Sequence, residues 1–166
     1  IYRAKVVLIG DSMSYQDAKF TGISMLDEQM LLGKKASAPF DYKSIIDVQP
    51  HQTSSLELMF SENRYGNYAG TLLYNFLYKY NISPREVVTW DAFPFHTHNA
   101  GDLLSNRPAR QYEIEAVHNI QREFFSIFNG CKMIALASSA QAMLDDIGID
   151  NVFISHPLQS GARTFS

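Results

Sequence analysis

The apolar positions of this chain follow two kinds of pattern. Short apolar runs predict buried strands at residues 6–10, 86–90, 132–137 and 151–155. Between them, apolar residues at helical spacing predict helices at 25–32, 55–60, 68–80, 111–129 and 138–147, with a short extended piece at 44–48. Strands separated by helices indicate a three-layer α/β/α domain with a central four-stranded, mainly parallel sheet.

Small or polar residues follow each predicted strand. They include Asp11 and Ser12 after the first strand, Asp91 after the second, Ser139 after the third and His156 after the fourth. In a parallel sheet the carboxyl ends of the strands meet at one edge, and ligands bind in the crevice outside it. We therefore expect the functional site at this edge.

Length and composition narrow the class of protein. The 166 residues predict a single domain over 1–166, which we expect to act as a monomer, and we expect further residues before Ile1 and after Ser166. The single cysteine, Cys131, excludes an internal disulfide or a multi-cysteine metal site and fits a reducing cytoplasm. No apolar run approaches the ~18 residues that span a membrane. The net charge of −3 argues mildly against a protein built mainly to hold nucleic acid.

One candidate chemistry is acyl transfer. The run Gly10-Asp11-Ser12 resembles the opening motif of the GDS-type (SGNH) esterases, which implies Ser12 as the nucleophile and His156 as its base. That family places an aspartate three residues before the histidine, where this chain has Phe153. This departure weakens the esterase interpretation.

A longer set of motifs indicates a different chemistry. Four segments share an order and spacing, and they lie at residues 89–94, 105–114, 133–140 and 154–161. Together they resemble the uracil-DNA glycosylase superfamily, particularly its thermostable branch. That branch carries four cluster cysteines that this chain lacks, so we expect no iron–sulphur cluster, no metal and no other cofactor. Two nearby histidines, His96 and His98, are expected to form a polar loop beside the pocket.

The resemblance implies roles for the strand-end residues. Asp11 stands where the family places its catalytic acid or asparagine, and His156 stands where a donor assists the departing base. Asp91 occupies the position of the asparagine that reads uracil. An ionised aspartate only accepts hydrogen bonds. Asp91 would therefore favour a base edge that offers donors, or be protonated, or activate water itself.

Further residues are implied to hold the base and the DNA. Gly10 belongs to the first motif, and Met25 stands where the family has a base-stacking aromatic, a role that Tyr15 or Phe20 could also fill. The loop after the last strand is implied to enter the minor groove, with an apolar wedge and a phosphate contact. Its candidate DNA-binding residues are Leu158, Ser160 and Arg163.

The resemblance predicts a DNA repair enzyme. Cleavage of an N-glycosidic bond uses a carboxylate near the developing oxocarbenium ion, a donor to the leaving base and a pocket for the extruded base. We expect the chain to hydrolyse this bond at uracil or another deaminated or damaged base in DNA. Two alternatives remain open, a superfamily member that binds nucleobases or nucleic acid without cutting, and the esterase with Ser12 and His156.

Overall fold

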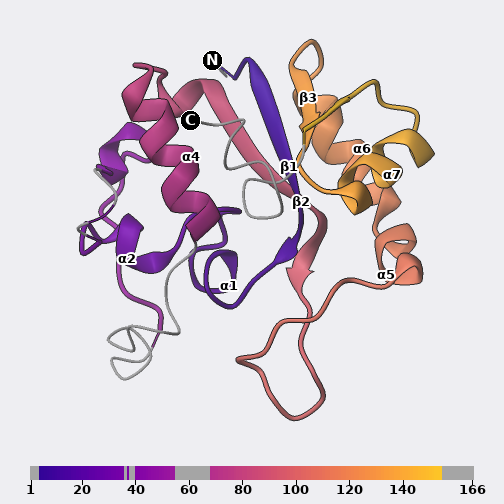
Figure 1. Cartoon of the computed structure of the whole chain (residues 1–166), viewed down its shortest axis with the longest axis horizontal. Helices are drawn as coiled ribbons and strands as arrows, with labels where there is room; N and C mark the ends of the chain where they lie inside the picture. The colour runs from indigo at the N-terminus through magenta and orange to yellow at the C-terminus, as the bar shows by residue number, and fades with distance from the viewer. Residues whose placement is uncertain (1–3, 36, 38–39, 55–67, 155–166) are drawn as a thin grey trace.

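A parallel sheet forms the centre of the molecule (Figure 1). The computed structural model describes residues 4–35, 37, 40–54 and 68–154. Within this part of the chain the sheet has four strands in the order β2-β1-β3-β4, each parallel to its neighbours. They are β1 (Val6–Met13), β2 (Val87–His96), β3 (Lys132–Ala135) and β4 (Val152–Phe153). The predicted fold class is confirmed.

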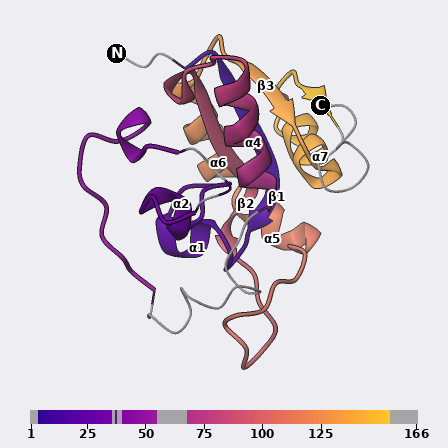
Figure 2. The same cartoon turned by 60° about the vertical axis from the view of Figure 1, so that its left-hand side comes forward.

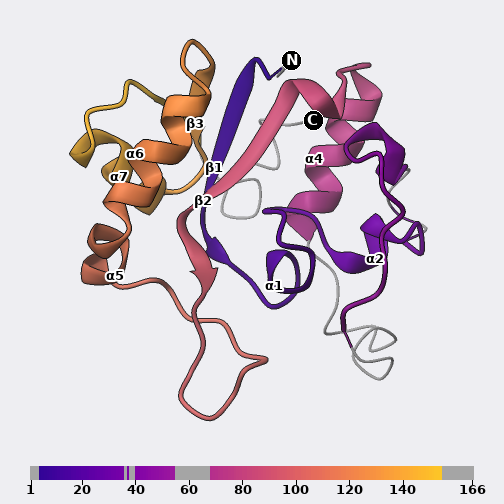
Figure 3. The same cartoon turned by 180° about the vertical axis from the view of Figure 1, so that it is seen from behind.

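Helices cover both faces of this sheet (Figures 1 and 3). Between β1 and β2 the chain forms α1 (Ala18–Thr21), α2 (Glu28–Leu31), the 3₁₀ helix η1 (Tyr42–Ser44), α4 (Tyr68–Lys79) and the 3₁₀ helix η2 (Pro84–Glu86). The opposite face carries α5 (Gln111–Ala116) and α6 (His118–Ile127) before β3, and α7 (Ser138–Asp146) before β4. The chain therefore adds β2 on one side of β1, then crosses the opposite face of the sheet and adds β3 and β4 on the other side of β1.

Two apolar cores hold the three layers together. Val7 and Ile9 of β1 are fully buried in the larger core, which also contains residues of β3, α6 and α7. The smaller core packs α2 against α4 through Leu26, Met30 and Leu77. Burying a side chain of this size stabilises the fold by about 1.5–3 kcal/mol. Strand β1 is thus fixed at the centre, and with it the position of the residues that follow Ile9.

A buried amide links α6 to β2. Gln121 is fully buried, and its Oε1 accepts a hydrogen bond of 2.6 Å from Trp90 Nε1. Its Nε2 donates to the Ala92 carbonyl oxygen at 2.6 Å. The Trp90 ring also stacks on Phe124, with ring centroids 3.6 Å apart. These contacts hold the part of β2 that carries Asp91.

The first two strands along the chain are longer than the sequence predicts. β1 continues to Met13 and β2 to His96, so the polar residues predicted as turns belong to strands. The extensions pair with each other, as Ser12 with Phe93 and Met13 with His96, and the register shifts between the two pairs. Such an irregularity accommodates Pro94, which has no N–H for the ladder. β4 is shorter than predicted, at two residues.

Helix boundaries also differ from the prediction. The helix expected at 111–129 breaks at Val117 (φ −105°, ψ 5°) into α5 and α6. The helix expected at 25–32 begins only at Glu28, because the Asp27 side chain caps it by accepting from Met30 N at 2.8 Å. The helix over 68–80 is confirmed as α4. The sequence does not predict α1 (Ala18–Thr21).

Two further expectations have different outcomes. The extended piece expected at 44–48 is wrong, because η1 occupies its start and no strand forms there. The helix expected at 55–60 lies outside the described residues.

Candidate functional site

The sheet order places the topological switch point between β1 and β3. These two strands are neighbours, and the chain leaves them toward opposite faces of the sheet. In open α/β sheets this switch point is where ligands bind. Asp11, exposed near the end of β1, accepts a hydrogen bond from the Ser139 hydroxyl in the first turn of α7. The two strand ends are therefore joined by side chains, as the sequence predicts for this edge.

Gly10, Met25 and Asp91 meet close to this end of the sheet. Asp91 pairs with Gly10 in the sheet, and its side chain is buried at 5 % exposure. A Cβ atom added to Gly10 would lie 2.6 Å from Asp91 Oδ1 and 3.1 Å from Met25 Cε. Only glycine lets both side chains approach the strand this closely. The structure thus brings together three of the residues that the resemblance assigns to the base pocket.

Burial controls the protonation of Asp91. The pKa of its carboxyl is raised from 3.8 to about 8. The main cause is removal from water; the nearby charges of Asp17 and Asp11 also raise the pKa, and a hydrogen bond with Ser24 lowers it. The carboxyl is therefore protonated at neutral pH. In this state it offers one donor and one acceptor, which an ionised aspartate cannot do.

Met25 is held in a strained turn. Its φ is 59°, in the left-handed region that residues other than glycine seldom occupy. The turn is fastened to β2 because Thr89 Oγ1 donates to the Ser24 carbonyl oxygen at 2.7 Å and Ser24 Oγ donates to the Trp90 carbonyl oxygen at 3.3 Å. The helices on either side of this turn, α1 and α2, lie beside the carboxyl ends of β1 and β2 (Figure 2). These bonds position Met25 over Gly10.

Asp17 belongs to the site although its role was not predicted. It caps α1, and its Oδ1 accepts a hydrogen bond of 2.9 Å from Ser14 N. It is 9 % exposed, and its charge acts on Asp91. The sequence signal was an aspartate immediately before Ala18, which is typical of a helix cap and carries no hint of the second role.

The other candidates for base stacking lie elsewhere. The Tyr15 ring packs edge-on against His96, with centroids 6.4 Å apart, and its backbone N–H donates to Asn106 Oδ1 at 3.1 Å. Lys19 Nζ lies 5.6 Å from the centre of the Phe20 ring. Of the three proposed stacking residues, Met25 is therefore the one that the structure places against Gly10 beside Asp91.

Ser12 lies inside a strand. It pairs with Phe93 within β1, and its hydroxyl makes no hydrogen bond with any residue that the structure describes. A serine nucleophile needs a base within hydrogen-bond reach. The esterase interpretation names His156 for that role, and His156 lies outside the described residues, as do Leu158, Ser160 and Arg163.

His96 is the last residue of β2, and His98 lies in the loop that follows, so the polar loop expected for both histidines is wrong for His96. His96 Nε2 donates to the Ser105 carbonyl oxygen at 2.8 Å, and burial, with the charges of Lys19 and His98, lowers the pKa of the His96 imidazole. Among the described residues, no group of three or more histidine, cysteine, aspartate or glutamate side chains converges as metal ligands would.

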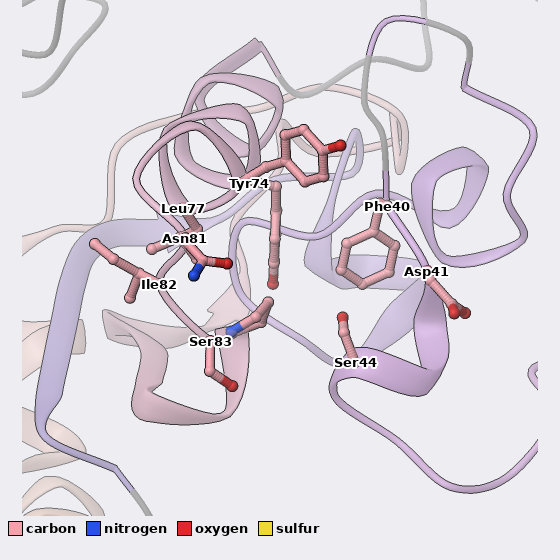
Figure 4. Close-up of a pocket in the computed structure, with 10 residues that line it drawn as sticks. Phe40, Asp41, Ser44, Tyr74, Leu77, Asn81, Ile82 and Ser83 are labelled. Atoms are coloured by element: carbon pink, nitrogen blue, oxygen red, sulfur yellow. The ribbon is translucent and has the colours of Figure 1, made fainter.

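A separate cavity of about 620 Å³ lies near the amino end of β2, at the opposite end of that strand from the candidate site (Figure 4). Phe40 and Ser44 form one wall, and Leu77 and Ile82 form the other. Its lining includes Pro84, just before β2, so this cavity is at the amino end of that strand and away from Asp91.

Comparison with known proteins leaves the structure as the main source of functional evidence. No protein-family model matches the sequence, and no curated protein matches it significantly. Within the described part of the chain, no helix combines the length and apolar character needed to cross a membrane. The structure shows an α/β domain in which the buried carboxyl of Asp91 lies near the switch point of the sheet.

Proposed function

We propose that this protein is a DNA glycosylase that hydrolyses the N-glycosidic bond of a deaminated base. The observation that carries the proposal is the buried, neutral carboxyl of Asp91 against Gly10 and Met25. The resemblance to the uracil-DNA glycosylase superfamily supports it, because Asp91 stands at the position of that family's uracil-reading asparagine. A neutral carboxyl and an amide each present one donor beside one acceptor.

This donor and acceptor pair matches the edge created by deamination. Uracil, hypoxanthine and xanthine each carry a ring N–H next to a carbonyl oxygen, and a neutral carboxyl can bond both groups at once. The Asp91 hydroxyl would donate to the carbonyl oxygen, and its carbonyl oxygen would accept from the ring N–H. Met25, whose side chain is flexible, would shift to admit the base and cover its face.

Asp11 supplies the carboxylate for the reaction itself. In hydrolysis a water oxygen bonds to C1′ of the sugar, the C1′–N bond breaks, and the base leaves with the electron pair. A carboxylate near C1′ stabilises the positive charge that develops there and can take the proton from water. Asp11 is exposed at the switch point and accepts a hydrogen bond from the Ser139 hydroxyl, which orients it. His156 would donate to the departing base, as the resemblance implies.

The proposal is tested with oligonucleotides that carry uracil, hypoxanthine or xanthine. Abasic product is measured by alkaline cleavage over a pH series. We expect product from at least one of these bases, with a rate that falls about tenfold per pH unit above pH 8 as Asp91 ionises. The Asp91→Asn variant keeps the donor and acceptor at every pH, so its rate should not show this fall.

Two controls define the outcome. Asp146→Asn removes an exposed carboxylate of α7 and should leave the pH profile unchanged. Asp11→Asn should lower the rate at every pH while binding persists. Absence of abasic product from all three substrates contradicts the proposal. If the wild type binds these oligonucleotides without releasing a base, the chain is a non-catalytic binding protein.

A further inference from the structure

A second cavity, of about 460 Å³, lies beyond Asp91 at the end of β2. Its walls come from the last residues of β2, from the loop that follows and from the residues around the start of α5. This loop extends away from the carboxyl end of the sheet (Figure 1). The register shift between β1 and β2 falls within this wall, at Phe93 to His96. Irregularities of this kind redirect side chains and occur often beside functional sites.

One wall of the cavity is aromatic. Phe93 and Phe95 lie edge to face, with centroids 5.5 Å apart and an angle of 67° between the rings. Phe95 is 51 % exposed, so a large apolar surface faces water at this point. Exposed aromatic rings beside a positively charged groove are typical of surfaces that stack the bases of single strands.

The opposite wall is rigid and positively charged. Arg107 forms two hydrogen bonds with Glu113, of 2.6 and 2.7 Å, and donates through Nε to the His98 carbonyl oxygen at 3.2 Å. The negative charge of Glu113 is thereby balanced by the positive charge of Arg107. Arg110 donates to Tyr112 Oη at 2.9 Å, but it forms no ion pair with a residue that the structure describes. Arg110 thus leaves the wall with one uncompensated positive charge.

A buried polar atom in the same cavity lacks a partner. His98 Nδ1 is shielded from solvent and has no hydrogen bond to any residue that the structure describes. The ring is held nearly parallel to His96, with centroids 5.4 Å apart and an angle of 23°. A buried polar atom without a partner is unfavourable, and a ligand in the cavity would satisfy this atom only if the His98 ring turned toward it.

We propose that this cavity holds the nucleotide next to the one whose base reaches Asp91, on a single strand of DNA. The base of this neighbour stacks on Phe95, and its phosphate contacts Arg110. Phe93 follows Asp91 by two residues on β2, which is about 7 Å along a strand, so one DNA strand can occupy both places. The inference rests on the proposed function in taking DNA as the ligand.

Anisotropy of a short fluorescein-labelled oligothymidylate without a damaged base tests the inference. Affinity is measured at several salt concentrations. Arg110→Gln should lower the slope of log K against log salt by about 0.7, the value for one phosphate contact on a single strand. Phe95→Ala should weaken binding at least about fivefold. Arg122→Gln and Phe153→Ala are matched controls, because both side chains are exposed and neither lines the cavity.

The outcomes separate this site from the proposed reaction. Binding by Arg110→Gln and Phe95→Ala at the wild-type level, equal losses in the control variants, or no salt-dependent binding by the wild type would each overturn the inference. If both variants lose affinity but no deaminated base is excised, the nucleotide site stands and the glycosylase proposal fails. If bases are excised while both variants bind normally, only the nucleotide site fails.

Discussion

The buried carboxyl of Asp91 should make the stability of the fold depend on pH. Its pKa is about 8 in the folded protein, against 3.8 when the group is exposed. Between these values the unfolded chain loses the proton and the folded chain keeps it. The folded state then binds more protons, so its stability falls as pH rises. Below pH 3.8 both states are protonated, and above pH 8 both are ionised, so the effect is confined to this window.

The magnitude follows from the size of the shift. Each pKa unit corresponds to about 1.4 kcal/mol, so the full shift corresponds to roughly 6 kcal/mol at pH 8. A domain of this kind has about 5–15 kcal/mol of stability in total. Entry of water around the ionised group recovers part of this loss, and we therefore expect about 2 kcal/mol or more.

Asp91→Asn is the variant that isolates this effect. Asparagine has nearly the same shape and does not titrate, so the variant should match the wild type near pH 4 and exceed its stability increasingly toward pH 8. Urea unfolding at a series of pH values, followed by the fluorescence of the single tryptophan, measures the difference. The control Asp146→Asn should give a curve parallel to the wild type. If Asp91→Asn also runs parallel, the carboxyl is ionised in the folded protein and the reasoning is refuted.

Three further substitutions are each followed by urea unfolding; two test contacts around Asp91 and the strand that carries it, and the third tests a buried contact between α2 and residues 53–54. Gly10→Ala places a methyl group 2.6 Å from a carboxyl oxygen of Asp91 and should destabilise the fold by about 1–3 kcal/mol. Gly22→Ala is the comparison, because Gly22 has a positive φ but open space around it, so this variant shows the cost of backbone strain without a steric clash. Gln121→Leu leaves the Trp90 N–H and a backbone carbonyl without their buried partner and should cost about 2 kcal/mol or more; a loss below about 0.5 kcal/mol would contradict the link to β2. The Glu28 carboxylate accepts hydrogen bonds from the backbone N–H and hydroxyl groups of residues 53–54. Glu28→Gln weakens these four hydrogen bonds and should lower the stability of the fold by about 1–3 kcal/mol. An unchanged stability would show that other contacts hold residues 53–54.

The sequence predicts the layers of the fold better than the ends of its elements. Apolar runs reveal buried strands because both faces of a parallel sheet are covered. The continuation of β2 through Asp91 to His96 is hidden, because polar residues and Pro94 are typical of loops and only pairing with the extended β1 makes them a strand. The break at Val117 is hidden for a different reason, since the apolar spacing continues across it.

The candidate site was predictable in its location and only partly in its chemistry. Strand order follows from long-range pairing, yet the polar strand ends already indicate the edge at which Asp11 and Asp91 lie. Protonation of Asp91 depends on burial and on the charge of Asp17, and neither can be judged from local sequence. Gln121 was equally hidden, because no pattern shows which backbone carbonyl a buried amide will reach.

The sheet order also has a consequence for how the chain folds. The central strand β1 is synthesised first, but its partners on either side are β2 at 87–96 and β3 at 132–135. An emerging chain therefore carries an apolar segment that cannot complete its pairing until most of the domain has left the ribosome. Long-range pairing of this kind slows folding and leaves apolar segments open to aggregation. We expect the yield of folded protein to depend on protection of residues 6–9 during synthesis.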